Sequence, residues 1–300
     1  MYYQYDEKVL KKLQNIQKNI LKDFQKICDK YEIKYFAIGG TLIGAVRHEG
    51  FIPWDDDIDL GMLREDFDKF LAIPNEEYNE NYYLCTPEKE NNYYSIIPKF
   101  ALKNTAYVTE LAEKTGVNPM GIFVEIFVFE NVSPDYKIRK RQIFKVNWIK
   151  NLHFQVVAKK VILVDKGVKA ALKYFVKSLL DFYVKIFNIT TRKTNGMFLD
   201  ATNLKHITGY VAYFGDGTTE DFLSEIDNLF PLIEKKFEDI VIMIPNNYHE
   251  LLTQAYGDYM KLPPIEDRWN QAPTILQFPH EAPIYLKKGN DGNEKNKKIL

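Results

Sequence analysis

The chain has 300 residues, of which 46% are apolar and 27% charged, which excludes a disordered or fibrous protein and suits a soluble globular one with a large core. Forty basic and forty-one acidic side chains give a net charge of −1, which excludes a uniformly basic surface for nucleic acid. Cys28 and Cys85 lie far apart and lack metal-ligand spacing, which excludes a disulfide scaffold and a structural zinc site.

Hydrophobic spacing predicts a mixed α/β arrangement in the first 130 residues. Apolar residues recur at spacings of three and four where a helix is expected, and short apolar runs bounded by turn residues indicate strands. In chain order we expect a helix over 6–30, a strand over 34–38, a helix over 41–50, an acidic strand over 55–62, a helix over 64–71, and strands over 82–86, 95–103, 105–110 and 122–129. Thr41 is expected to cap the second helix and Gly50 to end it. These elements predict a mixed sheet, with a loop at 116–121.

Beyond residue 130 the pattern becomes mostly helical. In chain order we expect two or three amphipathic helices over 134–190, a strand over 207–213, a helix around 220–229, a strand over 240–245 and a helix over 248–260. The expected division is therefore a catalytic core over 1–130, a mostly helical and basic part over 131–286 that completes the site, and a polar, disordered tail over 287–300.

The charge of the helical part is one-sided. From Lys137 to Lys193, fifteen Lys or Arg residues stand against only Asp165 and Asp181. These basic residues are either the solvated faces of packed helices or a surface for an anionic membrane or a lipid-linked glycan. No RNA- or DNA-binding motif accompanies them, so no nucleic-acid partner is expected.

The expected location is the cytoplasm, with peripheral contact at the inner membrane face as an option. The N-terminus is polar and has no signal-peptide core, and no run of about eighteen apolar residues predicts a membrane-spanning helix.

The most informative stretch joins a glycine pair to an acidic strand. Asp57 follows Gly40 by seventeen residues, and Asp59 comes two residues later. Residues two apart on a strand point to the same face, so Asp57 and Asp59 project together, with Asp55 if the strand extends that far. Converging carboxylates require a cation, and oxygen ligands at this density suit Mg²⁺ or Mn²⁺. The alternative is a solvated acidic turn.

A second carboxylate lies in the predicted strand 122–129, where Glu125 stands among seven apolar residues. An unpaired buried carboxylate is costly, so Glu125 needs a partner. A metal shared with Asp57 and Asp59 would supply one and form a three-carboxylate site suited to phosphoryl transfer. The alternatives are an ion pair with Lys or Arg and a neutral, protonated Glu125.

The glycine pair is a candidate phosphate site. A Gly39-Gly40 turn that leads through Thr41 into a helix brings backbone amides close to a phosphate at the positive helix end. Arg47, late on the same helix, either reaches a phosphate oxygen or pairs with Glu49 or Asp55.

Three segments carry a resemblance to a known family. The runs GGTLIGAVRHEGFIPWDDDIDLGM (39–62), GIFVEIF (121–127) and YGDYMKLPP (256–264) closely resemble the LicD family of phosphotransferases, which includes the fukutin-related branch. The resemblance implies a polymerase-β-like nucleotidyltransferase core of the α/β (α+β) class, with a mixed sheet and a C-terminal helical region. It places family metal-binding positions at Asp57 and Asp59, with Asp55 as a further one, and the third carboxylate at Glu125, where we expect Asp in many relatives.

The resemblance also implies a reaction. Phosphocholine, or another phospho-alcohol such as ribitol phosphate, passes from a CDP-linked donor to a glycan hydroxyl with release of CMP, in the decoration of cell-surface polysaccharide, teichoic acid or lipopolysaccharide. The hydroxyl attacks the distal phosphorus in line, and either a carboxylate of the cluster or a metal-bound water takes its proton. Two other functions stay open: a nucleotidyltransferase that adds NMP to a small acceptor, and a non-catalytic peripheral membrane-binding protein.

Five further residues are candidates for binding the donor. Trp54 either stacks on a base or sugar or anchors its loop, and Lys99 on a neighbouring strand is a phosphate candidate. Tyr256 and Tyr259 either receive the quaternary ammonium of a choline donor or pack the C-terminal helix. Arg268 either binds a donor phosphate or forms a surface salt bridge.

Overall fold

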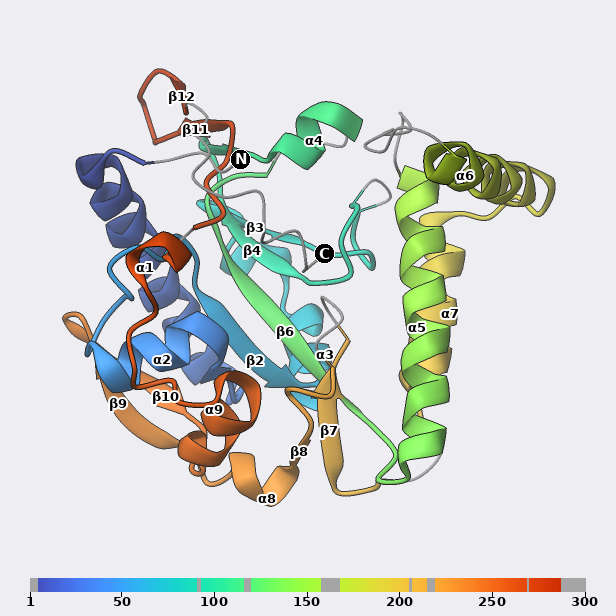
Figure 1. Ribbon diagram of the computed structural model, residues 1–300. Helices are drawn as coiled ribbons and strands as arrows, with labels where there is room; N and C mark the ends of the chain where they lie inside the picture. The colour runs from blue at the N-terminus through green and yellow to red at the C-terminus, as the bar shows by residue number, and fades with distance from the viewer. Residues whose placement is uncertain are drawn as a thin grey trace.

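A mixed sheet forms the centre of the computed structural model (Figure 1). The structure describes residues 5–90, 93–115, 120–157, 168–204, 207–214, 219–268 and 270–286. Within these ranges the sheet has seven strands: β1 (Phe36–Ala37), β2 (Asp59–Leu63), β3 (Tyr82–Cys85), β4 (Lys99–Leu102), β6 (Phe123–Asn131), β7 (Tyr210–Tyr213) and β8 (Ser224–Glu225). The predicted α/β class with a mixed sheet is confirmed. The predicted disordered tail, 287–300, and most of the predicted loop, 116–121, lie outside the described residues.

β6 is the central strand. It pairs with β2 in parallel along one edge and with β4 and β7 in antiparallel fashion along the other, while β1 extends the sheet beyond β2 and β3 extends it beyond β4. β4 pairs with residues 123–125 of β6, and β7 pairs with residues 129–131. The two strands therefore separate along the stretch of β6 between these segments. β7 follows residue 130 in the chain, yet it belongs to the same sheet, and the division of the chain at residue 130 stays a prediction.

Helices from the first half of the chain cover the sheet. These are α1 (Glu7–Lys30), α2 (Gly39–Arg47) and α3 (Arg64–Ala72). The same half of the chain also contains α4 (Glu110–Thr115) and the short 3₁₀ turn η1 (Asn75–Glu77). The predicted helices over 6–30 and 64–71 are confirmed. Asp6 caps α1 by accepting a hydrogen bond from the Lys8 amide, and the rings of Phe24, Phe70 and Phe100 meet at centroid distances of 5.2–6.0 Å between α1, α3 and the sheet.

Three predicted boundaries near the glycine pair are wrong, and one is the end of the second helix, which stops at Arg47 rather than at Gly50. The second helix begins at Gly39, so Thr41 lies inside α2, and its hydroxyl accepts a hydrogen bond from the Asp59 amide at 2.8 Å instead of capping the helix. The acidic strand begins only at Asp59. Its expected first residues form an extended loop because Gln14 and Gln17 of α1 donate to the carbonyl oxygens of residues 55 and 56, both at 2.8 Å.

The predicted strand 105–110 also ends early. β5 covers only Ala106–Val108, because the Thr109 hydroxyl accepts a hydrogen bond from the Ala112 amide at 3.2 Å and α4 begins. β5 pairs with β11 (Ile275–Gln277), which pairs with β12 (Ile284–Tyr285), so a C-terminal segment returns to the first half of the fold.

The basic part folds as predicted into helices, α5 (Tyr136–Val157), α6 (Val168–Ile186) and α7 (Thr191–Thr202). α7 packs along α5, and α6 lies across one end of α5 away from the sheet (Figure 1). Arg139 of α5 pairs with Glu220, and the His153 ring bonds Thr194 of α7 and the carbonyl of Tyr93. Among the described helices none combines the length and apolar character that crossing a bilayer requires.

The last third of the described chain contains α8 (Ile226–Leu229), β9 (Ile233–Phe237), β10 (Ile240–Ile244), α9 (Tyr248–Tyr256) and the 3₁₀ turn η2 (Ile265–Asp267). The strand predicted over 240–245 is confirmed as β10, and its hairpin partner β9 was not predicted because charged residues interrupt its apolar pattern. The helix expected around 220–229 is one turn, α8, because Ser224 and Glu225 pair with β7. α9 stops at Tyr256 rather than at residue 260, because Gly257 takes a φ of 64° and ends the helix.

Candidate active site

Two carboxylates lie against the glycine pair at the start of α2. Gly39 has a φ of +55°, a conformation that favours glycine, and a Cβ there would lie 2.9 Å from Asp59 Oδ2. A Cβ on Gly40 would lie 2.5 Å from Asp55 Oδ2. The carboxylates therefore approach the backbone at the helix N-terminus, where the dipole of α2 favours negative charge.

The strand register aligns three charged side chains. Asp59 of β2 lies opposite Glu125 of β6, and Glu125 lies opposite Lys99 of β4. Residues directly opposite each other in neighbouring strands project from the same face of a sheet. The structure thus brings Asp59, Glu125 and Lys99 into one row across the centre of the sheet.

Lys99 and Glu125 form an ion pair within this row. Only 7% of Lys99 is exposed, and its ammonium lies 3.6 Å from the centroid of the Phe123 ring. Burial acts to lower the pKa of Lys99, but the charge of Glu125 and its hydrogen bond outweigh burial and raise it, so Lys99 stays protonated. Of the alternatives for Glu125, the structure shows the ion pair. Its partner is Lys99, which the sequence suggested as a phosphate-binding residue.

The acidic loop before β2 concentrates negative charge. One carboxylate oxygen from each of Asp55, Asp56 and Asp57 lies within 4.8 Å of the others. Burial raises the pKa of Asp57 well above its ordinary value, and the nearby charges of Asp59, Asp55, Asp56 and Glu125 add to this effect. Burial and the charge of Asp56 raise the pKa of Asp55 to about 7. A cluster of this kind is stabilised by a cation.

Asp56 was not predicted, and it holds the loop in place. It is buried, and its carboxylate accepts hydrogen bonds from the Tyr5 hydroxyl at 2.8 Å, the Tyr107 hydroxyl at 2.9 Å and the backbone N–H of Gln271 at 2.9 Å. These donors come from the N-terminal segment, β5 and the C-terminal segment. Because such partners are distant in sequence, the Asp triplet gave no signal that its middle residue is an anchor.

Three of the predicted donor-binding residues gather beside the acidic loop. The guanidinium of Arg268 lies 4.8 Å from the centroid of the Trp54 ring, and its Nε donates to the Pro263 carbonyl at 3.0 Å. Arg47 donates to the Tyr259 carbonyl. Burial lowers the pKa of Arg47, and the charge of Arg268 lowers it further. Trp54 directly precedes Asp55 in the chain, so its contact places Arg268 close to the start of the acidic loop.

The two tyrosines of the YGDYM segment have different surroundings. Tyr259 is buried, and its hydroxyl bonds His249 Nδ1 at 2.9 Å, so it packs the end of α9. Tyr256 is 46% exposed, and its hydroxyl oxygen lies 3.7 Å from the position of a Cβ on Gly39. Tyr256 therefore reaches the start of α2, and Tyr259 does not point to open space.

Glu49, an expected partner of Arg47, pairs instead with Lys236.

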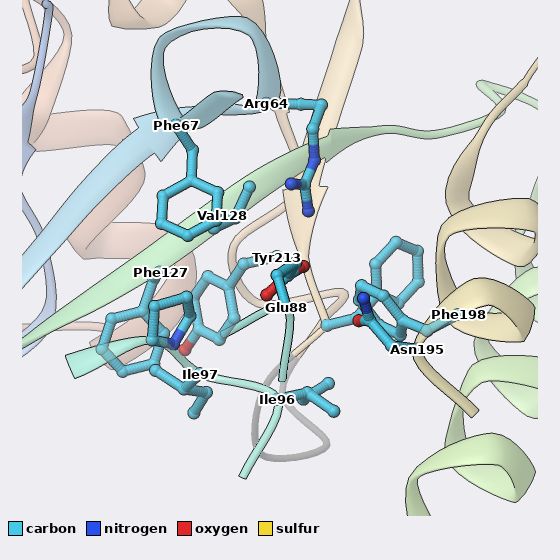
Figure 2. Close-up of a pocket in the computed structure, with 12 residues that line it drawn as sticks. Arg64, Phe67, Glu88, Ile96, Ile97, Phe127, Val128, Asn195, Phe198 and Tyr213 are labelled. Atoms are coloured by element: carbon cyan, nitrogen blue, oxygen red, sulfur yellow. The ribbon is translucent and has the colours of Figure 1, made fainter. Parts of the chain in front are cut away.

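The described residues also line two pockets, and the sequence indicated neither. Figure 2 shows one in the gap where β4 and β7 diverge along β6, with Phe127, Tyr213 and Phe198 among its walls and Arg64 beside it. The other pocket is apolar and opens beside Gly39, and its walls include Phe222. Rings connect the two regions, because Tyr213 lies 4.7 Å from Phe127 and 4.8 Å from Phe222 by centroid distance.

Comparison with known proteins identifies the family. Lipopolysaccharide cholinephosphotransferase LicD of Haemophilus influenzae is 33% identical over 264 residues, which cover 83% of this chain and 91% of that protein. The chain belongs to the LicD family. Residues 32–164 match the family model described as the LicD/FKTN/FKRP nucleotidyltransferase domain. This LicD domain contains every predicted site residue except Tyr256, Tyr259 and Arg268.

A more distant member of the LicD family matches over a shorter segment. Ribitol 5-phosphate transferase FKRP of Homo sapiens is 53% identical over 34 residues, which are 11% of this chain and 7% of that protein. The predicted membership of the LicD family is thus confirmed.

Proposed function

We propose that this protein transfers a phospho-alcohol group, phosphocholine or a polyol phosphate such as ribitol phosphate, from a CDP-linked donor to a glycan hydroxyl and releases CMP. The acceptor is a cell-surface glycan such as lipopolysaccharide or teichoic acid. The LicD relatives support the class of reaction, because one is named a cholinephosphotransferase and another a ribitol 5-phosphate transferase. The proposed compartment is the cytoplasm, where the free, buried thiols of Cys28 and Cys85 would stay reduced.

The observation that carries the proposal is the junction of α2 with the acidic loop and β6. The two glycines at the start of α2 lie close to Asp55 and Asp59, and the sheet register places Glu125 opposite Asp59. Amides at a positive helix end bind phosphate, and carboxylates from neighbouring strands bind the cation that accompanies a diphosphate. Few other reactions require both features within one small region.

The residues of the cluster fit a hard divalent cation, Mg²⁺ or Mn²⁺. The donors are all carboxylate oxygens, and burial together with the neighbouring carboxylates raises the pKa values of Asp55 and Asp57, which disfavours their charged forms unless a cation is bound. Asp55, Asp57 and Asp59 are the proposed ligands. Glu125 is the fourth proposed ligand, and it would then interact with both the cation and Lys99. Asp56 is excluded, since three donors already hold its carboxylate. A bound divalent cation would neutralise the diphosphate charge and stabilise the charge that develops during transfer.

The protein's own residues position and neutralise the reactants. The amides of Gly39, Gly40 and Thr41 bind phosphate oxygens, and Arg47 and Arg268 add positive charge on the side of Trp54. Trp54, already stacked against Arg268, is placed to contact the base or sugar of the donor. A carboxylate of the acidic cluster accepts the proton of the attacking hydroxyl.

The donor alcohol is assigned to the region of Tyr256. This ring is half exposed, reaches the start of α2 and lies 6.1 Å from the Phe222 ring by centroid distance. An aromatic face of this kind favours the quaternary ammonium of choline. We propose Tyr259 as a residue that supports this region, because its backbone carbonyl holds Arg47.

The test is a calorimetric titration of CDP-choline, CDP-ribitol, CDP-glycerol and CTP into the purified protein with Mg²⁺. The titrations are repeated with EDTA and with the Asp57→Asn/Asp59→Asn variant. Asn keeps the side-chain volume, so loss of binding reports on charge rather than on packing. We expect one CDP-alcohol to bind, and this binding to disappear in both controls.

Product analysis then separates the reactions. Release of CMP in the presence of an acceptor glycan supports phospho-alcohol transfer, and release of pyrophosphate from CTP identifies a nucleotidyltransferase. Binding of none of the four nucleotides by a folded protein would contradict both activities and leave the acidic cluster with a structural role.

A further inference from the structure

The outer face of α6 is apolar and exposed. Phe175, Leu179, Phe182 and Ile186 follow each other at spacings of four, three and four, so they form one stripe along the helix. Between 52% and 63% of each residue is exposed. A contiguous stripe of large apolar side chains in water is unusual in a soluble protein and marks a contact surface.

α5, which α6 crosses near its C-terminal end, carries further exposed aromatic side chains and exposed basic ones (Figure 1). Phe144 is 75% exposed and Trp148 41% exposed, and the Trp148 ring lies 6.5 Å from the Tyr183 ring of α6 by centroid distance. Exposed basic residues recur on the same side of α5, opposite its buried side: Lys137, Lys140, Arg141 and Lys145. We call the two outer faces together the aromatic-basic face, made of Phe175, Leu179, Phe182, Ile186, Phe144, Trp148, Lys137, Lys140, Arg141 and Lys145.

Two described acidic side chains accompany these basic residues, Asp135 directly before α5 and Asp181 on α6. The Asp135 carboxylate accepts hydrogen bonds from the amides of residues 137 and 138 at the start of α5, and the Asp181 carboxylate accepts one from Gln155. A hydrogen bond from a neutral amide does not cancel the charge of a carboxylate, but the four basic residues outnumber these two carboxylates, so the aromatic-basic face keeps a net positive charge. Figure 1 shows α6 at the edge of the molecule, away from the sheet and from α2, so a flat partner can approach it.

We infer that the aromatic-basic face docks the protein on an anionic lipid bilayer. The α6 stripe enters the boundary between headgroups and acyl chains, and Trp148 with the basic residues of α5 lies at the level of the anionic headgroups. A second copy of the chain fits this face poorly, because it would bring two positively charged surfaces together. Nucleic acid fits poorly as well, because phosphates offer nothing to the apolar stripe. Docking goes beyond the proposed reaction and does not depend on it, since it requires neither donor nor acceptor.

The test uses flotation of the full-length protein with vesicles. One set contains phosphatidylcholine alone and the other contains phosphatidylcholine mixed with phosphatidylglycerol. We expect binding to the mixed vesicles to be at least about tenfold tighter than to phosphatidylcholine, and to weaken as NaCl is raised. Equal binding to both sets, or no binding to either, would overturn the inference.

Substitutions separate the apolar and basic contributions. Leu179→Ser/Phe182→Ser is expected to weaken binding to the mixed vesicles by about tenfold or more. Lys140→Gln/Arg141→Gln is expected to weaken it by about tenfold and to flatten its salt dependence. The matched control is Val241→Ser on β10, which is 51% exposed, similar to the 52% of Leu179, and lies outside this face. The control should bind as the wild type does.

Two further readouts distinguish a bilayer from a second copy of the chain. Trp148 should shift its emission to the blue on mixed vesicles, and Trp148→Phe should remove that shift. Light scattering without vesicles should show the same molar mass for the wild type and for Leu179→Ser/Phe182→Ser. If the serine variant binds vesicles normally but changes from dimer to monomer, the partner of this face is a second copy of the chain and not a bilayer. Donor binding by calorimetry should be equal in all these variants, which keeps the docking test separate from the test of the reaction.

Discussion

Alanine in place of Gly40 is expected to disable the site without unfolding the protein. Gly40 is the second residue of α2, and its backbone is not in the left-handed region, so Ala adds no backbone strain. The new Cβ would lie 2.5 Å from Asp55 Oδ2, whereas an ordinary contact begins at 3.4 Å. The oxygen therefore has to move by about 0.9 Å. Because the atom lies at the end of a flexible side chain, the carboxylate moves and the helix stays.

The expected effect is larger on the rate than on stability. A displacement of about 1 Å at a reacting centre costs on the order of 100-fold in rate. The change from Gly to Ala inside a helix contributes about 0.5–1 kcal/mol of stability, which offsets part of the cost of moving Asp55. The assay is the rate of CMP release from the bound CDP-alcohol, combined with a thermal unfolding curve. Gly40→Ala should lower kcat/KM about 100-fold and shift Tm by no more than a few degrees.

The matched control is Gly196→Ala in α7, where a Cβ would meet no atom within 4 Å. This variant should keep full activity and be as stable as the wild type or slightly more stable. Two results would refute the reasoning. If Gly40→Ala keeps the wild-type rate, the position of Asp55 does not matter for the reaction. If Gly40→Ala loses more than about 3 kcal/mol of stability, the contact is part of the packing, since such losses are typical of disrupted cores.

Three further predictions concern charge. Lys99→Met leaves Glu125 without its buried cation, so urea unfolding should show a loss of about 3–5 kcal/mol, which the additional change Glu125→Gln partly restores. Mn²⁺ at about 100 times its Kd should stabilise the wild type by about 2.7 kcal/mol in thermal unfolding. Asp57→Asn should remove this response, and in EDTA it should unfold at a higher temperature than the wild type, because burial and neighbouring carboxylates disfavour the Asp57 charge. Burial lowers the pKa of His153 below its ordinary 6.5, so the unfolded chain binds the proton more readily. Stability should therefore fall as pH drops below 6.5, and less steeply in His153→Gln, as measured by urea unfolding on both sides of that pH.

Each of these predictions can fail in a recognisable way. A Lys99→Met variant as stable as the wild type would mean that Glu125 does not depend on an ion pair. An unchanged Mn²⁺ response in Asp57→Asn would remove Asp57 from the proposed ligands. Identical pH slopes for the wild type and His153→Gln would assign the acid sensitivity to other groups.

Local patterns predicted the parts of this fold that depend on local physics. The helix α1 follows from apolar residues at spacings of three and four, because one face of a helix must be buried. Strand β6 follows from an apolar run with a single carboxylate, because both faces of a central strand are covered. Boundaries were harder to predict. Thr41 looks like a helix cap, but its hydroxyl is bonded to the Asp59 amide, and that amide is distant in sequence.

The candidate site was also predictable in its composition and less so in its contacts. The glycine pair and the Asp residues stand within one segment, and the structure brings Asp55 and Asp59 to the start of α2, with Glu125 opposite Asp59 in the sheet. The sequence left three possible partners for Glu125: a metal ion, a Lys or Arg side chain, and a proton. The choice of Lys99 required the pairing of β4 with β6, because only that register places the ammonium opposite the carboxylate.

By itself, the sequence determined the α/β class, most helices and strands, and membership of the LicD family, and it indicated the acidic and glycine residues of the candidate site. These properties reside in short segments, where side-chain type and spacing decide burial and charge. The tertiary structure alone decided that Asp56 anchors its loop, that Tyr256 rather than Tyr259 reaches the glycines, and that the apolar stripe of α6 stays exposed. Such outcomes depend on which distant segments fold against one another, and a side chain acquires its partner, its burial and its pKa only when that packing is complete.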